Sequence, residues 1–538
     1  MSARRAARKP PAPPDELAPA LEAALLRHLE DAEAFGDRAE HARAAREYEA
    51  AIKLVPWQPL AYINLAVACG ETGDEAYIAR SVAAMRAGVA GGMADVHPLQ
   101  LNLAVALSEL ERDAEAAPHY LAAWRLSPTT PAALARGLST HLDQCAWRGH
   151  ERLTAVLASE AEHVGILELS RLGRAALARR AAERRSAAHA RDAADANANA
   201  DGRQRAGPAW RRRASRAPLR VGYLTADLHA EHPIGKVAAP LLREHSRHFG
   251  VRLFSTAADR TLSRAIAVAD GRGAIAVEEV AAGEATEAYA ARLREARLHI
   301  LIDLNSHTRG GRLDVTARRP APVSMSFLGY TGTSGARFVD YLPADRTLVP
   351  PSLARHYTER LVHLPHLEHA SQHGVAYRLP SAPPPAGLNR RAVLASWNSE
   401  KKLGPRDWAV WMNLARAAPR AVVQQAVAYP DAPGPENLRA QARAAGIDAR
   451  RRLRLVGRVD QASYFQRIAA ADLAVDVPYW NGVSSTLDIL WAGSPLVALS
   501  GELMLSRMSA ALLAALAVPH SVVHSLRAYE DAALALVA

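Results

Sequence analysis

From Leu219 to Gly501 the sequence repeats one pattern, in which short apolar segments alternate with longer segments of helical spacing. Apolar runs that recur in this way are typical of parallel strands, each followed by a helix that crosses back over the sheet. The clearest runs are LRVGYLTAD, VRLFST, LHILIDLN, VSMSFLGY, RLVHLP, AVLASWN, VVQQAVAY, LRLVGRV, LAVDVPY and PLVALSG. The pattern therefore predicts an α/β fold with parallel sheets covered by helices.

A Pro- and Ala-rich stretch, YRLPSAPPPAGLNRR, interrupts this pattern at residues 377–391. We therefore predict two Rossmann-like lobes, residues 218–376 and 385–538, joined by a linker at 377–384. In open parallel sheets a ligand binds beyond the carboxyl ends of the strands, so two lobes that face each other would enclose a ligand in the cleft between them.

The first third of the chain is rich in Ala and helical in its spacing. The string NLAVA occurs at 64–68 and again 38 residues later, and EYEAAIKLVP at 47–56 matches HYLAAWRLSP 72 residues later. Helical pairs with a period near 34 residues are typical of tetratricopeptide repeats, and the Gly-bearing insert AGVAGGMADVHP explains the longer period. We predict such repeats, with a concave groove, over residues 17–184. An ordinary Ala-rich helical bundle is the alternative.

Two segments flank the repeats, a Pro/Arg-rich start at 1–16, predicted to be disordered, and a charged linker predicted at 185–217. Seven arginines lie between Arg203 and Arg220, six of them in this linker, in a chain whose net charge is +11. It is interpreted as a solvated connection. A nucleic-acid contact is not favoured, because no nucleic-acid-binding module accompanies the arginines. Attraction of an anionic nucleotide substrate is a further interpretation.

Composition places the chain in a reducing, aqueous compartment. Two cysteines form neither a disulfide framework nor a metal cluster. The basic start is not followed by the apolar segment of a signal peptide. The longest apolar run, AALLAALAV, is too short to span a bilayer. We expect a cytoplasmic protein with no membrane contact, and the sequence leaves its oligomeric state open.

The stretch DVPYWNGVSSTLDILWAG, residues 476–493, links a predicted strand to a predicted helix. Asn481 and Gly482 suit a tight turn, and three hydroxyl residues follow at the helix start: Ser484, Ser485 and Thr486. Free backbone N–H groups and the helix dipole favour an anion at such a position. The alternative is plain capping, with Ser485 and Asp488 forming a capping box. In the first interpretation Asp488 instead faces the cleft and accepts hydrogen bonds from ribose hydroxyls.

Three further stretches follow predicted strands. WNSEKKLGP puts Asn398 at a strand end and Lys402 close behind it, where an ammonium group could neutralise a diphosphate. GYLTADLHAEHPIG carries His229 and His232, and a histidine in a cleft can act as a base or a donor. GYTGTSGA, rich in Gly and hydroxyls, could wrap a sugar or a peptide, or form a surface turn; its central residues are Gly332, Thr333, Ser334 and Gly335.

Two patterns are missing from both predicted lobes. No Asp-x-Asp pair follows a strand, although metal-dependent sugar transferases commonly use such a pair to hold a cation on a diphosphate. No phosphate loop of the G-x-x-x-x-G-K-[ST] kind is present either. We therefore expect a site without a metal ion and without ATPase chemistry.

The repeats are followed, in this order, by RVGYLTADLHAEHP, RRPAPVSMSFLGYTGTSGA, WNSEKKL, DVPYWNGVSSTLDILWAGSPLV and GELMLSR. The chain resembles in this the O-linked N-acetylglucosaminyltransferases of glycosyltransferase family 41. Bacterial members with tetratricopeptide repeats are the nearest in organisation, and Spindly-type fucosyltransferases belong to the same group. The resemblance implies a two-lobe fold of the GT-B type. It implies inverting transfer of N-acetylglucosamine from UDP-N-acetylglucosamine to Ser or Thr of proteins, without a cofactor or metal.

By position, the resemblance implies that Lys402 contacts the donor diphosphate and that Ser484 and Ser485 replace two threonines at the phosphate-binding helix start. It implies that Asp488 holds the ribose and that His232 lies near the sugar and acceptor. This sequence departs from the family pattern at three places, where Val483, Tyr464 and Ser399 replace His, His and Gln.

Three functions therefore stay open from the sequence. The first is an active protein glycosyltransferase whose repeats hold the acceptor polypeptide in their groove. Its donor is UDP-N-acetylglucosamine, with GDP-fucose or UDP-glucose as alternatives. The second is a degenerate, inactive transferase that serves as a repeat scaffold. The third is a protein that associates with nucleic acid through the arginines of the linker.

Overall fold

The computed structural model describes most of the chain, and these residues form two compact units, one within 1–153 together with 432–434 and one from the remainder. The residues described are 17–110, 112–127, 137, 139, 142–147, 173–199, 218–229, 232–257, 259–269, 275–281, 283–369, 371, 373–377, 391–428, 430 and 432–537. The predicted disordered start at 1–16 and the linker at 377–384, except Tyr377, lie outside them.

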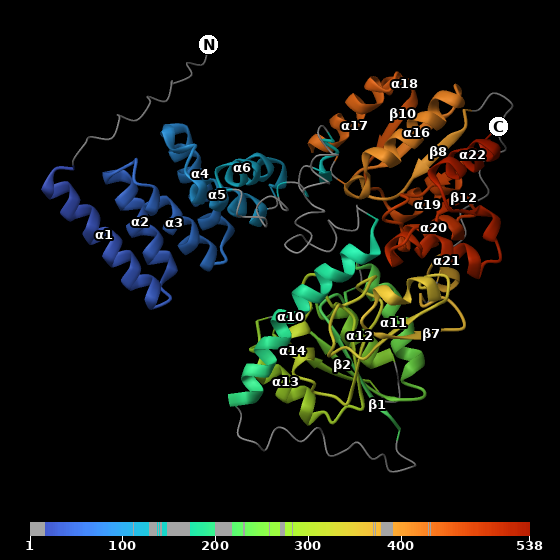
Figure 1. Ribbon diagram of the computed structural model, residues 1–538, viewed down its shortest axis with the longest axis horizontal. Coiled ribbons are helices and arrows are strands. Elements are labelled where there is room, and N and C mark those ends of the chain that lie inside the picture. The colour runs from blue at the N-terminus through green and yellow to red at the C-terminus, as the bar shows by residue number, and fades with distance from the viewer. Residues whose placement is uncertain are drawn as a thin grey trace. The chain divides into compact units, whose positions relative to one another are not determined.

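The first unit is helical throughout its described part, as predicted (Figure 1). Its helices are α1 (Pro19–Asp37), α2 (His41–Leu54), α3 (Pro59–Glu71), α4 (Glu75–Gly88), α5 (His97–Glu109) and α6 (Asp113–Leu126). Each packs on the next, and α3 also packs on α5, so the two NLAVA copies lie on neighbouring helices. The burial of small residues explains the Ala-rich composition, since Ala44, Ala51 and Ala61 are almost completely buried.

The long repeat period has a local cause at the end of α4. There the chain continues into a π-helical turn, η1 (Val89–Met93), in which Gly92 has φ = 116°. Only glycine adopts such a backbone conformation without steric cost, so Gly92 lets the chain leave the helix and reach α5. The insert that lengthens the period is therefore a wide turn between two otherwise ordinary helices.

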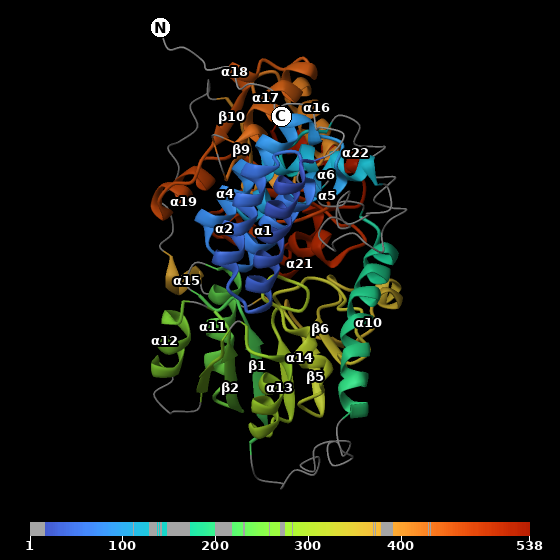
Figure 2. The same ribbon diagram turned by 90° about the vertical axis from the view of Figure 1, so that its left-hand side faces the viewer.

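The second unit contains two α/β lobes. In the N-terminal lobe a seven-stranded parallel sheet has the order β3-β2-β1-β4-β5-β6-β7 (Figure 2). Its strands are β1 (Arg220–Thr225), β2 (Gly250–Ser255), β3 (Ile275–Glu279), β4 (Ile300–Asp303), β5 (Val323–Ser326), β6 (Tyr341–Ala344) and β7 (Arg360–His363). The helices of this lobe are α11 (Pro233–His245), α12 (Thr261–Ala269), α13 (Thr286–Glu295), α14 (Leu313–Ala317) and the short η4 (Pro351–His356).

The C-terminal lobe has a six-stranded sheet of order β10-β9-β8-β11-β12-β13, again parallel. Its strands are β8 (Val393–Ser396), β9 (Val422–Ala426), β10 (Leu453–Val456), β11 (Leu473–Val475), β12 (Leu496–Leu499) and β13 (Val522–Val523). Its helices are η5 (Glu400–Lys402), α16 (Pro405–Ala417), α17 (Pro433–Ala444), α18 (Ala449–Arg452), α19 (Gln461–Ala469), α20 (Ser484–Trp491), η6 (Met504–Ser506), α21 (Met508–Ala515), η7 (Pro519–Ser521) and α22 (Leu526–Val537).

Both sheets are covered on both faces, which explains their nearly continuous apolar strands. Every residue of β8, β11 and β12 is buried. The two lobes meet at an apolar cluster in which Leu348 and Val349 pack with Met504 and Met508. Arg507 Nε also donates to the carbonyl of Thr347 at 2.7 Å. The carboxyl ends of both sheets thereby border one cleft, as the sequence predicts.

The predicted linker at 185–217 is wrong for residues 185–199, which belong to a long helix, α10 (Ala175–Asn199). This helix packs on the N-terminal lobe beside α14 (Figure 2). Ser186 Oγ donates to the carbonyl of Ser334, and Ala193 joins the cluster of Leu313 and Phe338. The boundary predicted at residue 184 therefore falls inside a helix, and the arginine-rich residues 200–217 lie outside the described part.

The end of the N-terminal lobe also differs from the prediction. In the last turn before residue 377, α15 (His373–Ala376), His373 contacts the C-terminal lobe, and Tyr377 packs on the apolar cluster of that lobe. The ring of Tyr377 lies 5.1 Å from that of Phe465, and the ring of His373 lies 6.1 Å from that of Trp491. Contacts with the second lobe therefore begin before residue 376, the predicted boundary.

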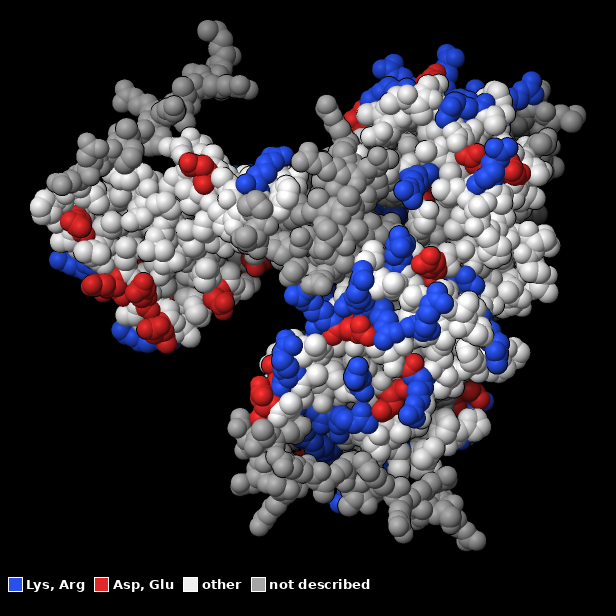
Figure 3. All heavy atoms as spheres, viewed as in Figure 1, with Lys and Arg blue, Asp and Glu red and all other residues white. Residues whose placement is uncertain are grey.

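The charge of the chain is spread over the folded surface as well as the arginine-rich stretch. Lys and Arg side chains gather over the N-terminal lobe on the face seen in Figure 3, among fewer acidic ones. Within the part of the chain that the structure describes, no helix combines the length and apolarity needed to cross a membrane.

Candidate functional site

The loop between β11 and α20 is folded around one buried carboxylate, Asp476, which follows the last residue of β11. Its Oδ1 accepts hydrogen bonds from Asn398 Nδ2 at 2.6 Å, Val477 N at 2.8 Å and Gly482 N at 3.0 Å. Its Oδ2 accepts a hydrogen bond from the Ser509 hydroxyl. Burial raises the pKa of Asp476. This carboxylate therefore fixes the path of the loop that leads to the start of α20.

The glycine in this loop is required by close packing. A Cβ atom at Gly482 would lie 2.1 Å from Ser485 Oγ and 2.8 Å from Asn398 Oδ1, so a larger residue fits only if these side chains move. Asn481 is fully buried, donates to the Val477 carbonyl at 2.9 Å and accepts from Ser509 N at 3.2 Å. These residues, predicted to bind a donor, shape the loop from inside.

Helix α20 begins at Ser484, as predicted, and its N-cap is Val483, which has no side-chain cap. The capping-box interpretation of Ser485 and Asp488 is therefore wrong. The hydroxyl of Thr486 is buried and donates to the Gly482 carbonyl at 2.6 Å, so the prediction that it binds a ligand is not supported. Ser485 Oγ lies 3.4 Å from Asn398 Oδ1. The first-turn N–H groups have no carbonyl partner within the helix.

Lys402 reaches the same loop from η5, which follows β8. Its Nζ donates to the Asn481 carbonyl at 3.3 Å and lies 5.5 Å from the centroid of the Trp480 ring. Burial lowers the pKa of the Lys402 ammonium group, and the charge of Asp476 opposes that effect. A desolvated ammonium group of this kind binds an anion more strongly than one in water. The structure thus brings Lys402 to the loop that begins α20.

Asp488 lies one turn further along α20 and is held by two side chains from other elements. Its Oδ1 lies 2.8 Å from Nε2 of His373, and its Oδ2 accepts from the Tyr464 hydroxyl at 3.1 Å. No signal in the sequence linked His373 to Asp488, because 115 residues separate them. Tyr464, singled out as a departure from the family pattern, is one of the two partners.

A cavity of about 330 Å³ lies between the lobes and is lined by α20, α15 and α11. Ser484, Leu487 and Asp488 contribute one wall, and the first turns of α11 contribute the other. Two cations of α11, Lys236 and Arg243, also line it and were not predicted. Their signal was available in the sequence, since both follow the His-Pro pair at helical spacing. The cavity thus presents positive groups together with one carboxylate.

His232 is the N-cap residue of α11, and its Nδ1 accepts from the backbone N–H of Ile234 at 3.3 Å. In the neutral ring the proton then resides on Nε2, which lies 3.9 Å from Asp227 Oδ1. Burial lowers the pKa of His232 and favours this neutral form, although Asp227 opposes the effect. Asp227 is itself fixed by Asn305 Nδ2 at 2.7 Å. In this arrangement Nε2 is the ring nitrogen that can donate a hydrogen bond, and the role of His232 as base or donor stays a prediction.

The loop at 332–335, predicted to wrap a sugar or a peptide or to form a surface turn, is largely buried. Thr333 and Ser334 are 6% and 0% exposed. Thr333 Oγ1 donates to Glu359 at 2.7 Å, and the backbone N–H of Ser334 donates to it at 2.6 Å. Gly335 has φ = 66°, and a Cβ there would lie 2.1 Å from the backbone nitrogen of Glu183 in α10. Residues 333–335 thus pack inside the lobe and against α10, whereas Gly332 lines a small pocket beside Ala175 and Ala178 of that helix.

The predicted residues thus separate into two groups. Ser484 and Asp488 line the cavity, with Lys402 on the neighbouring loop and His232 at the start of α11. Asn398, Asn481, Gly482 and Thr486 support the loop from inside. Among the residues described, no group of three or more His, Cys, Asp or Glu side chains is placed to hold a metal ion.

The sequence was compared with known protein families. The profile of the family described as Glycosyl transferase family 41 matches residues 203–379 and 385–538, which is more than half of the chain and includes both lobes. The chain belongs to glycosyl transferase family 41.

Two curated relatives illustrate how far this family 41 chain resembles other members. It is 29% identical over 329 residues to a protein of Arabidopsis thaliana named probable UDP-N-acetylglucosamine--peptide N-acetylglucosaminyltransferase SEC. It is 26% identical over 330 residues to the SPINDLY protein of Oryza sativa subsp. japonica, which carries the same enzyme name. These matches cover 59% and 60% of this chain but only 33% and 35% of the relatives. The family 41 chain therefore matches about a third of their length.

A comparison of structures supports the same architecture over nearly the whole chain. A mutant O-GlcNAc transferase of Thermobaculum terrenum superposes with a TM-score of 0.62, and the match covers 97% of this chain and 91% of that one. The two sequences are 22% identical, so this likeness concerns the fold. Helical repeats followed by two Rossmann-like lobes of the GT-B type are thus the fold of this family 41 member.

Proposed function

We propose that this chain is a protein O-glycosyltransferase that transfers N-acetylglucosamine from UDP-N-acetylglucosamine to Ser and Thr side chains, with inversion and without a metal ion. The observation that carries the proposal is the cavity at which Ser484, Asp488 and the first turns of α11 meet. The enzyme name of the relatives supports the same donor and acceptor.

In this reaction the acceptor oxygen forms a bond to the anomeric carbon while the bond from that carbon to the diphosphate oxygen breaks. The electron pair leaves with the diphosphate, and the proton of the acceptor hydroxyl passes to that diphosphate or to water. Stabilising the charge that develops on the leaving group commonly contributes more to such catalysis than any other effect. The first-turn N–H groups of α20 and the Lys402 ammonium group are assigned this role, because both lie at one loop.

The remaining residues are assigned by the groups they present. Asp488 accepts hydrogen bonds from the ribose hydroxyls. His232 donates through Nε2–H toward the sugar or the acceptor, since its Nδ1 is already occupied by Ile234 N. Lys236 and Arg243 of α11 add positive charge on the opposite wall and attract the anionic donor.

The acceptor polypeptide is assigned to the groove of the helical repeats, which stacked helical pairs form in general. A cytoplasmic location is part of the same proposal, and it is supported by the two cysteines, which are buried thiols outside any disulfide. Cell fractionation tests the location. The acceptor groove is tested by comparing which glycosylated proteins co-purify with the whole chain and with a variant that lacks residues 17–127.

The decisive experiment measures UDP release from UDP-N-acetylglucosamine together with labelling of a Ser/Thr peptide or protein acceptor. We expect labelling that persists in EDTA, and UDP should raise the melting temperature more than GDP does. A larger effect of GDP would favour a GDP-fucose donor. Binding of UDP without turnover would identify an inactive scaffold. If neither nucleotide binds, the proposal fails.

A further inference from the structure

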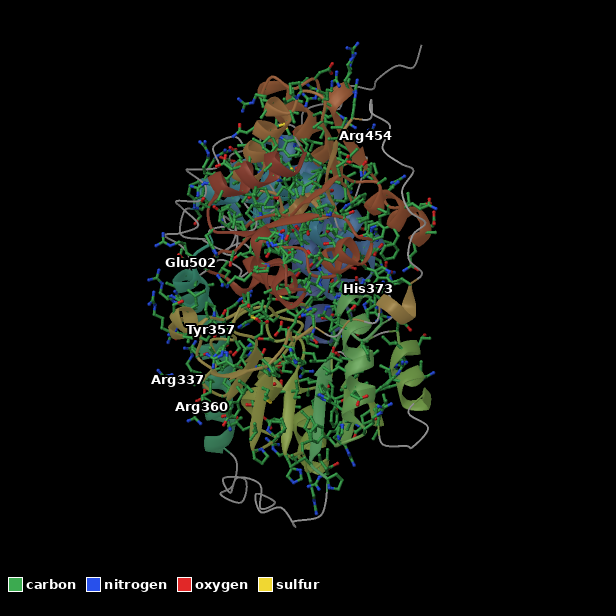
Figure 4. The ribbon with its side chains drawn as sticks, turned by 90° about the vertical axis from the view of Figure 1, so that its right-hand side faces the viewer. Arg337, Tyr357, Arg360, His373, Arg454 and Glu502 are labelled. Carbon is green, nitrogen blue, oxygen red and sulfur yellow. The ribbon has the colours of Figure 1, made fainter. Side chains whose placement is uncertain are left out.

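The carboxylate of Asp488 is held in one orientation before any ligand is present. Each of its oxygens has its own partner, His373 on Oδ1 at 2.8 Å and Tyr464 on Oδ2 at 3.1 Å. The contact is sheltered from water, because the side chains of His373 and Asp488 are 13% and 20% exposed. Figure 4 shows His373 at the level where the two lobes of this unit meet. Asp488 is therefore not a freely rotating surface carboxylate.

His373 is fixed as firmly as the carboxylate it contacts. Its Nδ1 lies 2.7 Å from Ser371 Oγ, so both ring nitrogens have partners. The ring of Tyr377 meets its face edge-on at 4.9 Å between centroids, and the ring of Trp491 lies at 6.1 Å. A ring held on three sides retains little rotational freedom. It can therefore determine the direction in which Asp488 points.

This arrangement leaves part of the carboxylate available to a ligand. An ionised carboxylate has about four acceptor positions, and the contacts to His373 and Tyr464 occupy two of them. The cavity of about 330 Å³ is lined by both Asp488 and His373, and Ser484 is beside them. A pair of adjacent hydroxyls, as on a ribose ring, presents two donors to such a carboxylate. Fixing the acceptor in advance reduces the ordering cost when those donors bind.

We propose that His373 is a positioning residue that orients the Asp488 carboxylate toward the ribose hydroxyls of the donor nucleotide, with Tyr464 as its second support. The inference rests on the proposed function, which puts the nucleotide in this cavity. It extends that function by making ribose recognition depend on a side chain that acts through Asp488.

The test compares UDP with 2′,3′-dideoxy-UDP by calorimetric titration. The wild-type chain should bind UDP roughly tenfold or more tightly than the dideoxy form, as expected for loss of hydrogen bonds to a charged group. In His373→Ala this preference should shrink to about threefold or less, because the carboxylate can then rotate away. A merely structural role would weaken both ligands equally and leave their ratio unchanged.

Three further variants make the result interpretable. His373→Gln keeps a donor toward Asp488 and should restore much of the preference. Tyr464→Phe removes a single hydroxyl, so it gives the same readout even if His373→Ala does not fold. His366→Ala is the matched control, because His366 is an exposed histidine of the same connecting segment and is not one of the two side chains that hold Asp488. It should behave like the wild type.

The outcomes separate this inference from the function on which it rests. If the wild-type chain does not bind UDP, the proposed function fails. If it binds UDP and prefers it to the dideoxy form, but His373→Ala and Tyr464→Phe keep the full preference, the function stands and the positioning role of His373 is overturned.

Discussion

Replacing Lys402 with methionine removes one ammonium group and keeps most of the side-chain volume. In the free protein this group makes one hydrogen bond, to the Asn481 carbonyl at 3.3 Å, and one contact with the Trp480 ring. Burial lowers its pKa, so the fold holds the charged form at a cost. We therefore expect the melting temperature of Lys402→Met to equal or exceed that of the wild type, while catalysis falls.

The size of the catalytic effect follows from the contact that the ammonium group would make. A hydrogen bond between charged groups contributes ~1.5–3 kcal/mol net, and about 1.4 kcal/mol corresponds to a factor of ten in rate. One such contact to the leaving diphosphate is therefore worth roughly 10- to 150-fold. Because charge on the diphosphate grows toward the transition state, the loss should fall on kcat more than on KM. We expect a decrease in kcat of about 10²-fold.

The assay follows UDP release with saturating acceptor, alongside thermal melting and UDP titration. Lys401→Ala serves as the control, since it removes the same charge from the neighbouring position in η5, and it should retain most of the activity. A Lys402→Met variant that melts normally and turns over within twofold of the wild type would refute the assignment of Lys402 to the diphosphate.

Three other perturbations test the geometry of the same lobe. Gly482→Ala should weaken UDP binding severalfold by titration, because its Cβ would displace the side chains of Ser485 and Asn398, and unchanged affinity would contradict the close packing of this loop. Burial raises the pKa of Asp407 from 3.8 to about 7. This carboxyl therefore favours folding below pH 4, and the contribution, ~4 kcal/mol at most, is lost as the pH rises through 7. The free energy of unfolding, measured by urea denaturation, should fall from pH 5 to pH 8 in the wild type. It should fall much less in Asp407→Asn, whose amide oxygen can still accept from Gly404 N. An equal fall in both proteins would rule out Asp407 as the source. UDP affinity should decrease as the pH rises. Because burial lowers the pKa of Lys402, the decrease should occur below the ordinary lysine value of 10.5. Titrations of Lys402→Met should lack that decrease.

The sequence was most informative about the strands. The ten apolar runs noted in the sequence all contain strands of the two sheets, since strands buried on both faces have an unmistakable composition. Three of the described strands were missed for physical reasons. β3 lies at the edge of its sheet and ends in Glu278 and Glu279, β6 contains Pro343, and β13 is an edge strand of two residues. None has the continuous apolar character of a central strand.

Helix α10 was mistaken for a linker because its buried face carries almost no hydrophobic signal. The residues that pack on the N-terminal lobe are small, among them Ala182, Ser186 and Ala193. Most polar positions of the helix are Arg, Glu or Asp, which are typical of a solvated segment as well as of a helix surface. The partner of this face is the backbone at Gly335, which a pattern of hydrophobic residues does not reveal.

For the candidate site, the sequence predicts where α20 begins and that Lys402 lies near it. It does not show which polar groups face inward. The hydroxyl of Thr486 is occupied because Gly482 and Ser509 are its neighbours in space, and Asp488 is paired because His373 folds back from a distant segment. Such contacts depend on the tertiary structure, and no local spacing in the sequence encodes them.

The contact between the last helix and the β11–α20 loop has a practical consequence. The hydroxyl of Tyr529, fully buried in α22, donates to the carbonyl of Asp476 at 3.0 Å. Proteolysis or a stop codon upstream of Leu526 would therefore remove one of the hydrogen bonds that hold Asp476, the residue at the centre of that loop. Deletion series intended to separate acceptor selection from catalysis should accordingly begin at the amino end. A fragment trimmed from the other end would lose both properties together and be misread as evidence that they cannot be separated.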